Sequence, residues 1–226
     1  MEQNNTLQNK IIYIYILIFC YTFAILFLKV YLLYFSKKYI WYTFLKSIYI
    51  MIFSNFLNDI SNLKNTSDYL PIVNGCLNTV LIIIFLVFNG FFGSAILKKW
   101  YIKFQLGAVL VDTLKLVIGI IITIFFYKYL FNEFSIWKFT GLAIIIQLIH
   151  DLIFYLVFNS MPRGYNVMLD FFNDYSKEIG IGDILGDSFM MILACLLSSH
   201  FATYNSTANT IFLTILLYFS PYLLNL

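Results

Sequence analysis

Residues 105–130, with the sequence QLGAVLVDTLKLVIGIIITIFFYKYL, form a long apolar segment that is interrupted by Asp112 and Lys115. A membrane-spanning helix needs about 20 mostly apolar residues, and this segment exceeds that length. Asp112, Lys115, Gly119 and Thr123 follow one another at helical spacing, so they form one stripe along the helix. Because lipid offers no partner for a charge, we expect this stripe to face the interior of a helix bundle.

The composition of the whole chain supports the same class of protein. Of the 226 residues, 62% are hydrophobic and 11% are charged, whereas an average soluble domain has about 25% charged residues. This predicts an all-α polytopic transmembrane helix bundle that forms a single domain, residues 1–226. The net charge of +3 argues against nucleic-acid binding. The cysteines, at 20, 76 and 195, are too far apart for a metal or disulfide framework, so we expect no metal or other cofactor.

Seven apolar segments are predicted to span the membrane. They cover residues 11–35, 39–57, 77–97, 105–130, 136–158, 181–200 and 207–224. The segment 39–57 contains Lys46 and could instead lie flat in the interface, which would leave six spans. Residues 165–178 repeat their apolar side chains at helical spacing, which predicts a short amphipathic helix on the cytoplasmic membrane surface.

The distribution of basic residues predicts the orientation. In the seven-span arrangement one side carries Lys37, Lys38, Lys98, Lys99, Lys103, Arg163 and Lys177. The positive-inside rule places this side in the cytoplasm, so the N-terminus is expected outside or in a lumen and the C-terminus in the cytoplasm. The three N-x-S/T sequons, at Asn4, Asn65 and Asn205, all fall on the outer side in this arrangement.

Polar residues within the spans are predicted to lie at one depth. At about 1.5 Å per residue they come out roughly 9–12 Å below the cytoplasmic surface. The residues of this layer are Lys29, Lys46, Asn89, Asp112, Asp151 and Asp187, with Lys115 about one turn deeper. The three lysines and three aspartates balance in formal charge, which suits a purely structural network as well as a pathway for ions.

The candidate residues of such a pathway form one set: Asp112, Lys115, Gln147, His150, Asp151, Asp187 and Ser188. A carboxylate can hold and release a cation or proton, and imidazole changes its protonation near neutral pH. For Asp151 and Asp187 the functional and structural interpretations remain equally open. Lys115 is interpreted as a counter-ion to Asp112 or Asp151. His150 is interpreted as a helix-packing residue rather than a metal ligand, because no second intramembrane histidine accompanies it.

Small residues predict where helices approach closely. Gly90 and Gly93 lie at the end of the segment 77–97, and Gly182 and Gly186 form a small-xxx-small pair in the segment 181–200.

Several familiar classes of membrane protein are disfavoured. A microbial rhodopsin would need a retinal-binding lysine in its last span, and 207–224 has none. The HExxH, GxSxG and P-loop motifs are absent from the sequence, so no catalytic residue is assigned. Gly186-Asp187 is reminiscent of the GxGD motif of intramembrane aspartyl proteases, but Gly182 is not at the required spacing.

The stretch 150–191, HDLIFYLVFNSMPRGYNVMLDFFNDYSKEIGIGDILGDSFMM, resembles uncharacterised multi-span membrane proteins of large DNA viruses of protists and algae. The resembling features are His150-Asp151, Gly164, Asn166, Asp170-Phe171-Phe172, Tyr175, Glu178 and Gly186-Asp187-Ser188. The resemblance implies a viral origin and a location in the virion or a host membrane. It implies no particular chemistry.

Three hypotheses about function follow. The first is a channel- or transporter-like protein that moves a proton or small cation through the Asp/His/Lys layer. The second is a structural or assembly protein of a membrane, viral or not, whose charges only fix helix packing. The third, a membrane-embedded enzyme, is the least favoured. The expected partner is the lipid bilayer, and assembly into a homo-oligomer is left open.

Overall fold

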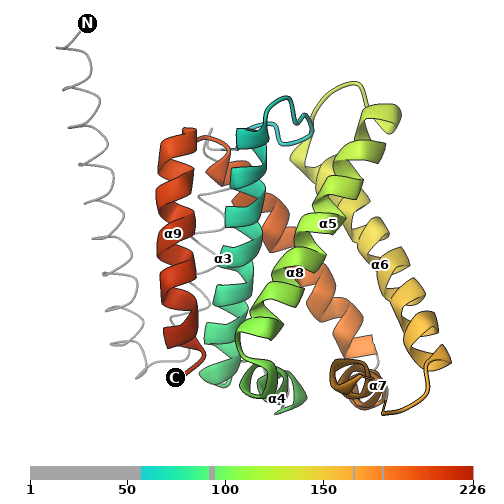
Figure 1. The fold of residues 1–226 in the computed structure, drawn as a ribbon. Coiled ribbons are helices and arrows are strands. Elements are labelled where there is room, and N and C mark those ends of the chain that lie inside the picture. The colour runs from blue at the N-terminus through green and yellow to red at the C-terminus, as the bar shows by residue number, and fades with distance from the viewer. Residues whose placement is uncertain (1–56, 92–94, 165, 180, 226) are drawn as a thin grey trace, which may run out of the picture. The chain divides into compact units, whose positions relative to one another are not determined.

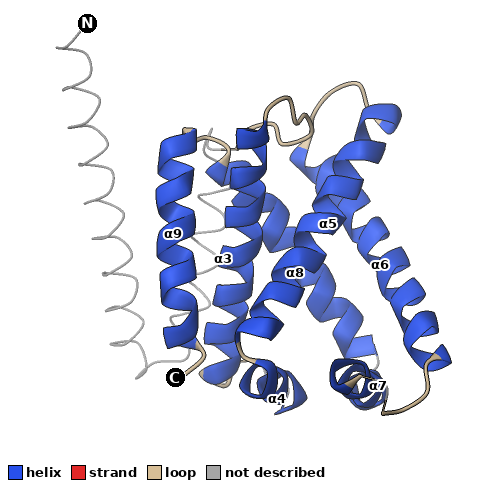
Figure 2. Cartoon of the chain, in the orientation of Figure 1, coloured by secondary structure: helices blue, strands red, loops and turns tan. Residues whose placement is uncertain are grey.

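The computed structural model describes residues 57–91, 95–164, 166–179 and 181–225. In this part of the chain all regular structure is helical, as predicted (Figure 2). The elements are the short 3-10 helix η2 (Thr66–Asp68) and the α-helices α3 (Tyr69–Phe88), α4 (Ala95–Phe104), α5 (Leu106–Leu130), α6 (Ile136–Ser160), α7 (Val167–Ile179), α8 (Ile181–Phe201) and α9 (Ser206–Leu223). The predicted segments 11–35 and 39–57 lie outside the described residues, except for Leu57.

Within the described residues three helices are long and apolar enough to cross a membrane: Thr66–Phe88, Leu106–Leu130 and Ile136–Phe158. The prediction placed five spans in this part of the chain, so its total of seven is not reached. The apolar part of α8, Leu185–Phe201, is shorter than these helices and falls short of about 20 residues. Helix α9 opens with the polar run Ser206–Thr210, interrupted only by Ala208.

The third predicted span, 77–97, is displaced in the structure, because α3 begins at Tyr69 and ends at Phe88. Gly90 stops the helix: it adopts a φ of 72°, a left-handed conformation that glycine adopts without strain. Its N–H donates to the carbonyl of Val87 at 3.1 Å, and the N–H of Phe91 donates to the carbonyl of Leu86 at 2.9 Å. These two bonds form a Schellman motif, which closes a helix after its last turn.

The longer helices alternate in direction, and α4 and α7 lie crosswise at one end of them (Figure 1). We call this the α4–α7 end; α3 and α6 end there, and α5 and α8 begin there. The opposite, loop end holds residues 57–68, 131–135 and 202–205. Helix α3 packs against α8, α9 and α5, and α6 packs against α5 and α8. The amphipathic helix predicted at 165–178 is thus observed as α7, and its position on a membrane surface stays a prediction.

Helices α3 and α8 approach each other closely at Gly75 of α3. A Cβ atom there would collide with the backbone of Ser198 in α8. The Ser198 hydroxyl donates to the carbonyl of Ile72 at 3.4 Å. In membranes, small and hydroxylated residues stabilise helix pairs in this way, because the lipid provides little hydrophobic drive for association.

The close-packing glycines therefore differ from those predicted. Gly119 of α5 faces α8, and a Cβ there would lie 2.8 Å from the Met191 methyl carbon. By contrast, no atom of the described residues would lie within 4 Å of a Cβ at Gly90 or Gly186, because Gly90 serves a turn and Gly186 is exposed near the start of α8. Gly93 lies outside the described residues, and the surroundings of Gly182 are not described.

Candidate functional site

Lys115 of α5 joins two other helices through its ammonium group. Its Nζ lies 3.1 Å from Oδ1 of Asp151 in α6 and 2.5 Å from Oδ2 of Asp187 in α8. We call these three residues the Lys115 cluster. Their side chains are 25%, 22% and 20% exposed, so the cluster is partly open rather than sealed. The structure thus brings together three of the predicted pathway residues from segments far apart in the sequence.

Two further predicted residues surround Asp151 on its own helix. The buried amide of Gln147 donates to Asp151 Oδ1 at 2.7 Å, and Nδ1 of His150 lies 3.2 Å from the same oxygen. Together with Lys115, this places three nitrogens around Oδ1. The other oxygen, Oδ2, is buried and has no hydrogen-bond partner among the described residues. One oxygen of this carboxylate is therefore saturated, while the other is available to a proton or cation.

His150 stays on the surface of α6. Its ring stacks on Phe154, one turn later, with a centroid separation of 4.5 Å. Its contacts with Asp151 and Phe154 are both within α6. The imidazole is thus placed to modulate the charge of Asp151.

Asp112 lies outside the Lys115 cluster and is held by two donors of α4. Its Oδ2 accepts hydrogen bonds from the Tyr101 hydroxyl at 2.9 Å and from the indole N–H of Trp100 at 3.2 Å. Both donors belong to α4, so Asp112 fastens α4 to the first turns of α5. Lys115 was predicted to pair with Asp112 or Asp151, and the structure pairs it with Asp151, and also with Asp187, rather than with Asp112.

The predicted polar layer therefore divides into separate parts. Asn89 donates to the carbonyl of Phe85 on its own helix at 2.8 Å. Lys29 and Lys46 lie outside the described residues. Ser188 follows Asp187 and is half-buried. The charged residues that the structure describes in this layer are partly exposed, so they do not form the buried, balanced layer that was expected.

The Lys115 cluster is unbalanced in charge. One ammonium group faces two carboxylates, which leaves a formal charge of −1 while His150 is neutral. A bound proton, a small cation or a protonated His150 would each remove the excess. In the described part of the chain no group of three or more His, Cys, Asp or Glu residues is arranged to hold a metal ion.

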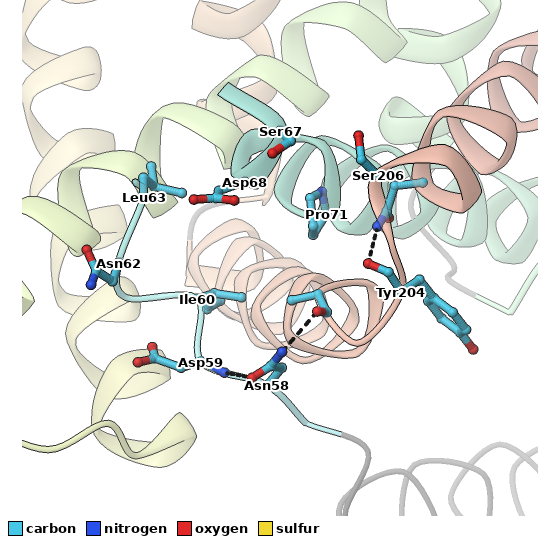
Figure 3. A pocket seen from close by; sticks show the side chains of 12 residues that line it. Asn58, Asp59, Ile60, Asn62, Leu63, Ser67, Asp68, Pro71, Tyr204 and Ser206 are labelled. Atoms are coloured by element: carbon cyan, nitrogen blue, oxygen red, sulfur yellow. Dashed lines mark hydrogen bonds between the residues drawn. The ribbon is translucent and has the colours of Figure 1, made fainter. Parts of the chain in front are cut away.

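A polar pocket of about 230 Å³ lies at the loop end (Figure 3). Its polar lining includes Asn58, Asp59, Asn62, Asp68, Ser206 and Asn209. Asn58 fixes the loop before α3 to the end of α8, since its N–H donates to the carbonyl of Ser199 at 3.1 Å and its side chain to that of Ala202 at 3.0 Å. The sequence prediction missed this pocket; the Asn- and Asp-rich stretch 58–68 was the signal that could have indicated it.

No protein-family model, curated protein or solved structure matches this chain. The resemblance of residues 150–191 to viral membrane proteins stays a prediction. The geometry of the Lys115 cluster is accordingly the basis on which a function can be assigned.

Proposed function

We propose that this chain is an integral membrane protein that moves a proton or a small cation through the Lys115 cluster. The supporting observation is the sharing of one ammonium group between two carboxylates, Asp151 and Asp187, on different helices. Ionisable residues within membrane spans are costly, and they commonly mark proton relays or ion paths.

The excess negative charge on the carboxylates of the Lys115 cluster would attract a cation or proton. Asp151 Oδ2 has no hydrogen-bond partner among the described residues, so protonation there breaks no hydrogen bond. Lys115 then acts as a fixed counter-charge that weakens the attraction for the cation and permits release. His150 lies beside the same carboxylate, with its Nδ1 3.2 Å from Asp151 Oδ1.

The orientation that we propose places the α4–α7 end in the cytoplasm. Basic residues at this end include Lys98, Lys99, Lys103 and Arg163, whereas the loop end has Lys64, Lys128 and Lys138. This imbalance favours the cytoplasm for the α4–α7 end. Helix α9 also ends there, so the C-terminus is proposed to be cytoplasmic (Figure 1).

A structural function is the second candidate, and the same ion pairs favour it. Lys115 contacts both carboxylates directly, which is how a helix bundle tolerates charges among apolar side chains. In that case the cluster would only fix α5, α6 and α8 in register, and the protein would serve membrane structure or assembly.

Flux measurements in liposomes separate the two candidates. Proton flux and cation flux are measured for the wild type, Asp151→Asn and Asp187→Asn. Asp174→Asn is the matched control, because Asp174 is 58% exposed on α7 and pairs with Arg163 away from the cluster. We expect flux from the wild type and the control, and at least a tenfold loss in both cluster variants. Equal flux from all four proteins, or flux from none, would exclude transport through the cluster.

A further inference from the structure

Helix α4 presents three exposed lysines. Lys98, Lys99 and Lys103 are all exposed, while Trp100 and Tyr101 are buried. Lys99 and Lys103 are one helical turn apart on the same side of the helix, and Lys98 lies about 100° around the helix from Lys99, so the three side chains cover a broad arc of its exposed surface. The short helix therefore has a strongly cationic outer surface and an aromatic inner surface.

The inner surface holds α4 in this orientation. The Trp100 ring contacts the rings of Phe104 and Phe172, with centroid separations of 4.7 and 4.8 Å. Phe172 belongs to α7, so the two crosswise helices pack on each other. The hydrogen bonds from Trp100 and Tyr101 to Asp112 fix the same face against α5. The lysines consequently stay on the outer side.

The charge of this face is not neutralised within the described residues. The salt bridges found there involve Lys115, His150 and Arg163, and none involves a lysine of α4. The sequence has no acidic residue between 95 and 111.

Aromatic rings hold two of these ammonium groups close to the protein surface. Nζ of Lys98 lies 5.3 Å from the centre of the Phe88 ring, and Nζ of Lys103 lies 5.2 Å from that of Phe104. A cation–π contact positions an ammonium group without cancelling its charge.

The position of α4 identifies the partner. It follows α3 and precedes α5, and both of these helices are long and apolar enough to span a membrane. A helix that links the ends of two spans lies at the level of the lipid headgroups. Lysine clusters immediately beside membrane spans attract the phosphate groups of anionic lipids.

We propose that Lys98, Lys99 and Lys103 bind the headgroups of anionic phospholipids in the cytoplasmic leaflet. The proposal rests on the assignment of α3 and α5 as membrane spans and is independent of ion movement through the Lys115 cluster. Bound lipid would fix the depth of α4 and, through Trp100 and Asp112, the start of α5.

The test measures which lipid stays bound to the full-length protein. The detergent-solubilised chain is incubated with equal amounts of phosphatidylserine and phosphatidylcholine, gel-filtered, and the retained lipids are quantified by mass spectrometry. The test variant replaces Lys98, Lys99 and Lys103 with glutamine. The control variant replaces Lys64, Lys128 and Lys138 with glutamine in the same way. These three are exposed lysines of the loop end.

We expect the wild type and the control variant to retain more phosphatidylserine than phosphatidylcholine. The α4 variant should retain roughly tenfold less phosphatidylserine than the wild type. Raising the salt to about 1 M should release the same lipid from the wild type, because screening is then nearly complete. Equal retention by the α4 and control variants, or equal retention of the two lipids by the wild type, would overturn the proposal. If the glutamine variant does not fold, the salt series and a Lys→Arg triple variant, which should keep the lipid, decide the question.

Discussion

Lys115 and Asp187, which are 72 residues apart in the sequence, form an ion pair of 2.5 Å between α5 and α8. The same ammonium group lies 3.1 Å from Asp151 of α6. Three helices therefore depend on one positive charge. Without the Lys115 ammonium group, the carboxylates of Asp151 and Asp187 would lie near each other without a counter-charge. Two neighbouring negative charges repel each other.

Lys115→Met should consequently destabilise the protein. Removing one partner of a fully buried pair costs about 3–5 kcal/mol; we expect about 1–3 kcal/mol here because the cluster is partly exposed. Unfolding by SDS, followed by circular dichroism, measures the loss. The double variant Lys115→Met/Asp187→Asn should recover part of it. A single variant as stable as the wild type would show that the pair does not hold the helices together.

Gly75→Ala tests the close approach of α3 to α8. Because the new methyl group would collide with the backbone of Ser198, the two helices must separate, and we expect a loss of about 1–3 kcal/mol. Gly141→Ala is the matched control, since a Cβ there would have no neighbour within 4 Å in the part of the chain that the structure describes. Thermal unfolding in detergent should show a lower midpoint for Gly75→Ala alone. Equal unfolding midpoints for the two variants would show that α3 and α8 do not pack closely at Gly75.

Tyr101→Phe removes one of the two hydrogen bonds that fasten α4 to Asp112. Hydrogen bonds to a charged acceptor are worth about 1.5–3 kcal/mol, so α4 should open more often. Amide hydrogen exchange over residues 95–104 should accelerate, while exchange over α3 stays unchanged. Tyr222→Phe, which alters only an exposed bond to Tyr218, serves as the control. Unchanged exchange in α4 would contradict the anchoring role of Asp112.

Asn209 joins α9 to the end of α8 and to α3. Its buried amide nitrogen donates to the carbonyls of Phe201, Tyr204 and Asn205 at 3.0–3.2 Å, and its side-chain oxygen accepts from Asn74 at 2.9 Å. Asn209→Leu should cost about 1–3 kcal/mol, because it removes the buried side-chain hydrogen bonds that join α9 to Phe201 and to Asn74. Thr210→Val, one residue later and exposed, should change the stability little. SDS unfolding of the two variants side by side checks the difference.

The depth of polar residues was the most informative sequence signal for the site. Helical rise and alternating spans placed Lys115, Asp151 and Asp187 within reach of one another, and the structure joins them. The partner of Asp112 was missed because residues 95–104 were not predicted as a helix of their own: residues 95–97 were assigned to the span 77–97, and the residues after it to no element. Trp100 and Tyr101 of α4 reach Asp112 only because the chain turns back from α4 into α5.

Helix ends were missed where the prediction followed hydropathy and passed over local chemistry. The pair Asn89-Gly90 is a typical helix stop, but the apolar residues after it extended the predicted span to 97. The start at Tyr69 was missed because Asn74 lowers the local hydropathy, although this residue is buried and bonded to Asn209. Long-range pairing of this kind has no local sequence pattern.

The central claim, that ions move through the Lys115 cluster, requires that water reaches the cluster. The most direct measurement is the reactivity of Asp187→Cys and Asp151→Cys toward a charged, membrane-impermeant thiol reagent, in a Cys20→Ser background. The native thiols of Cys76 and Cys195 are buried and provide the unreactive reference. Leu152→Cys, on the exposed apolar surface of α6 that we expect to contact lipid, is the control. We predict rapid modification at 151 and 187 and none at 152. Protection of both cluster positions, equal to that of Leu152→Cys, would contradict the account.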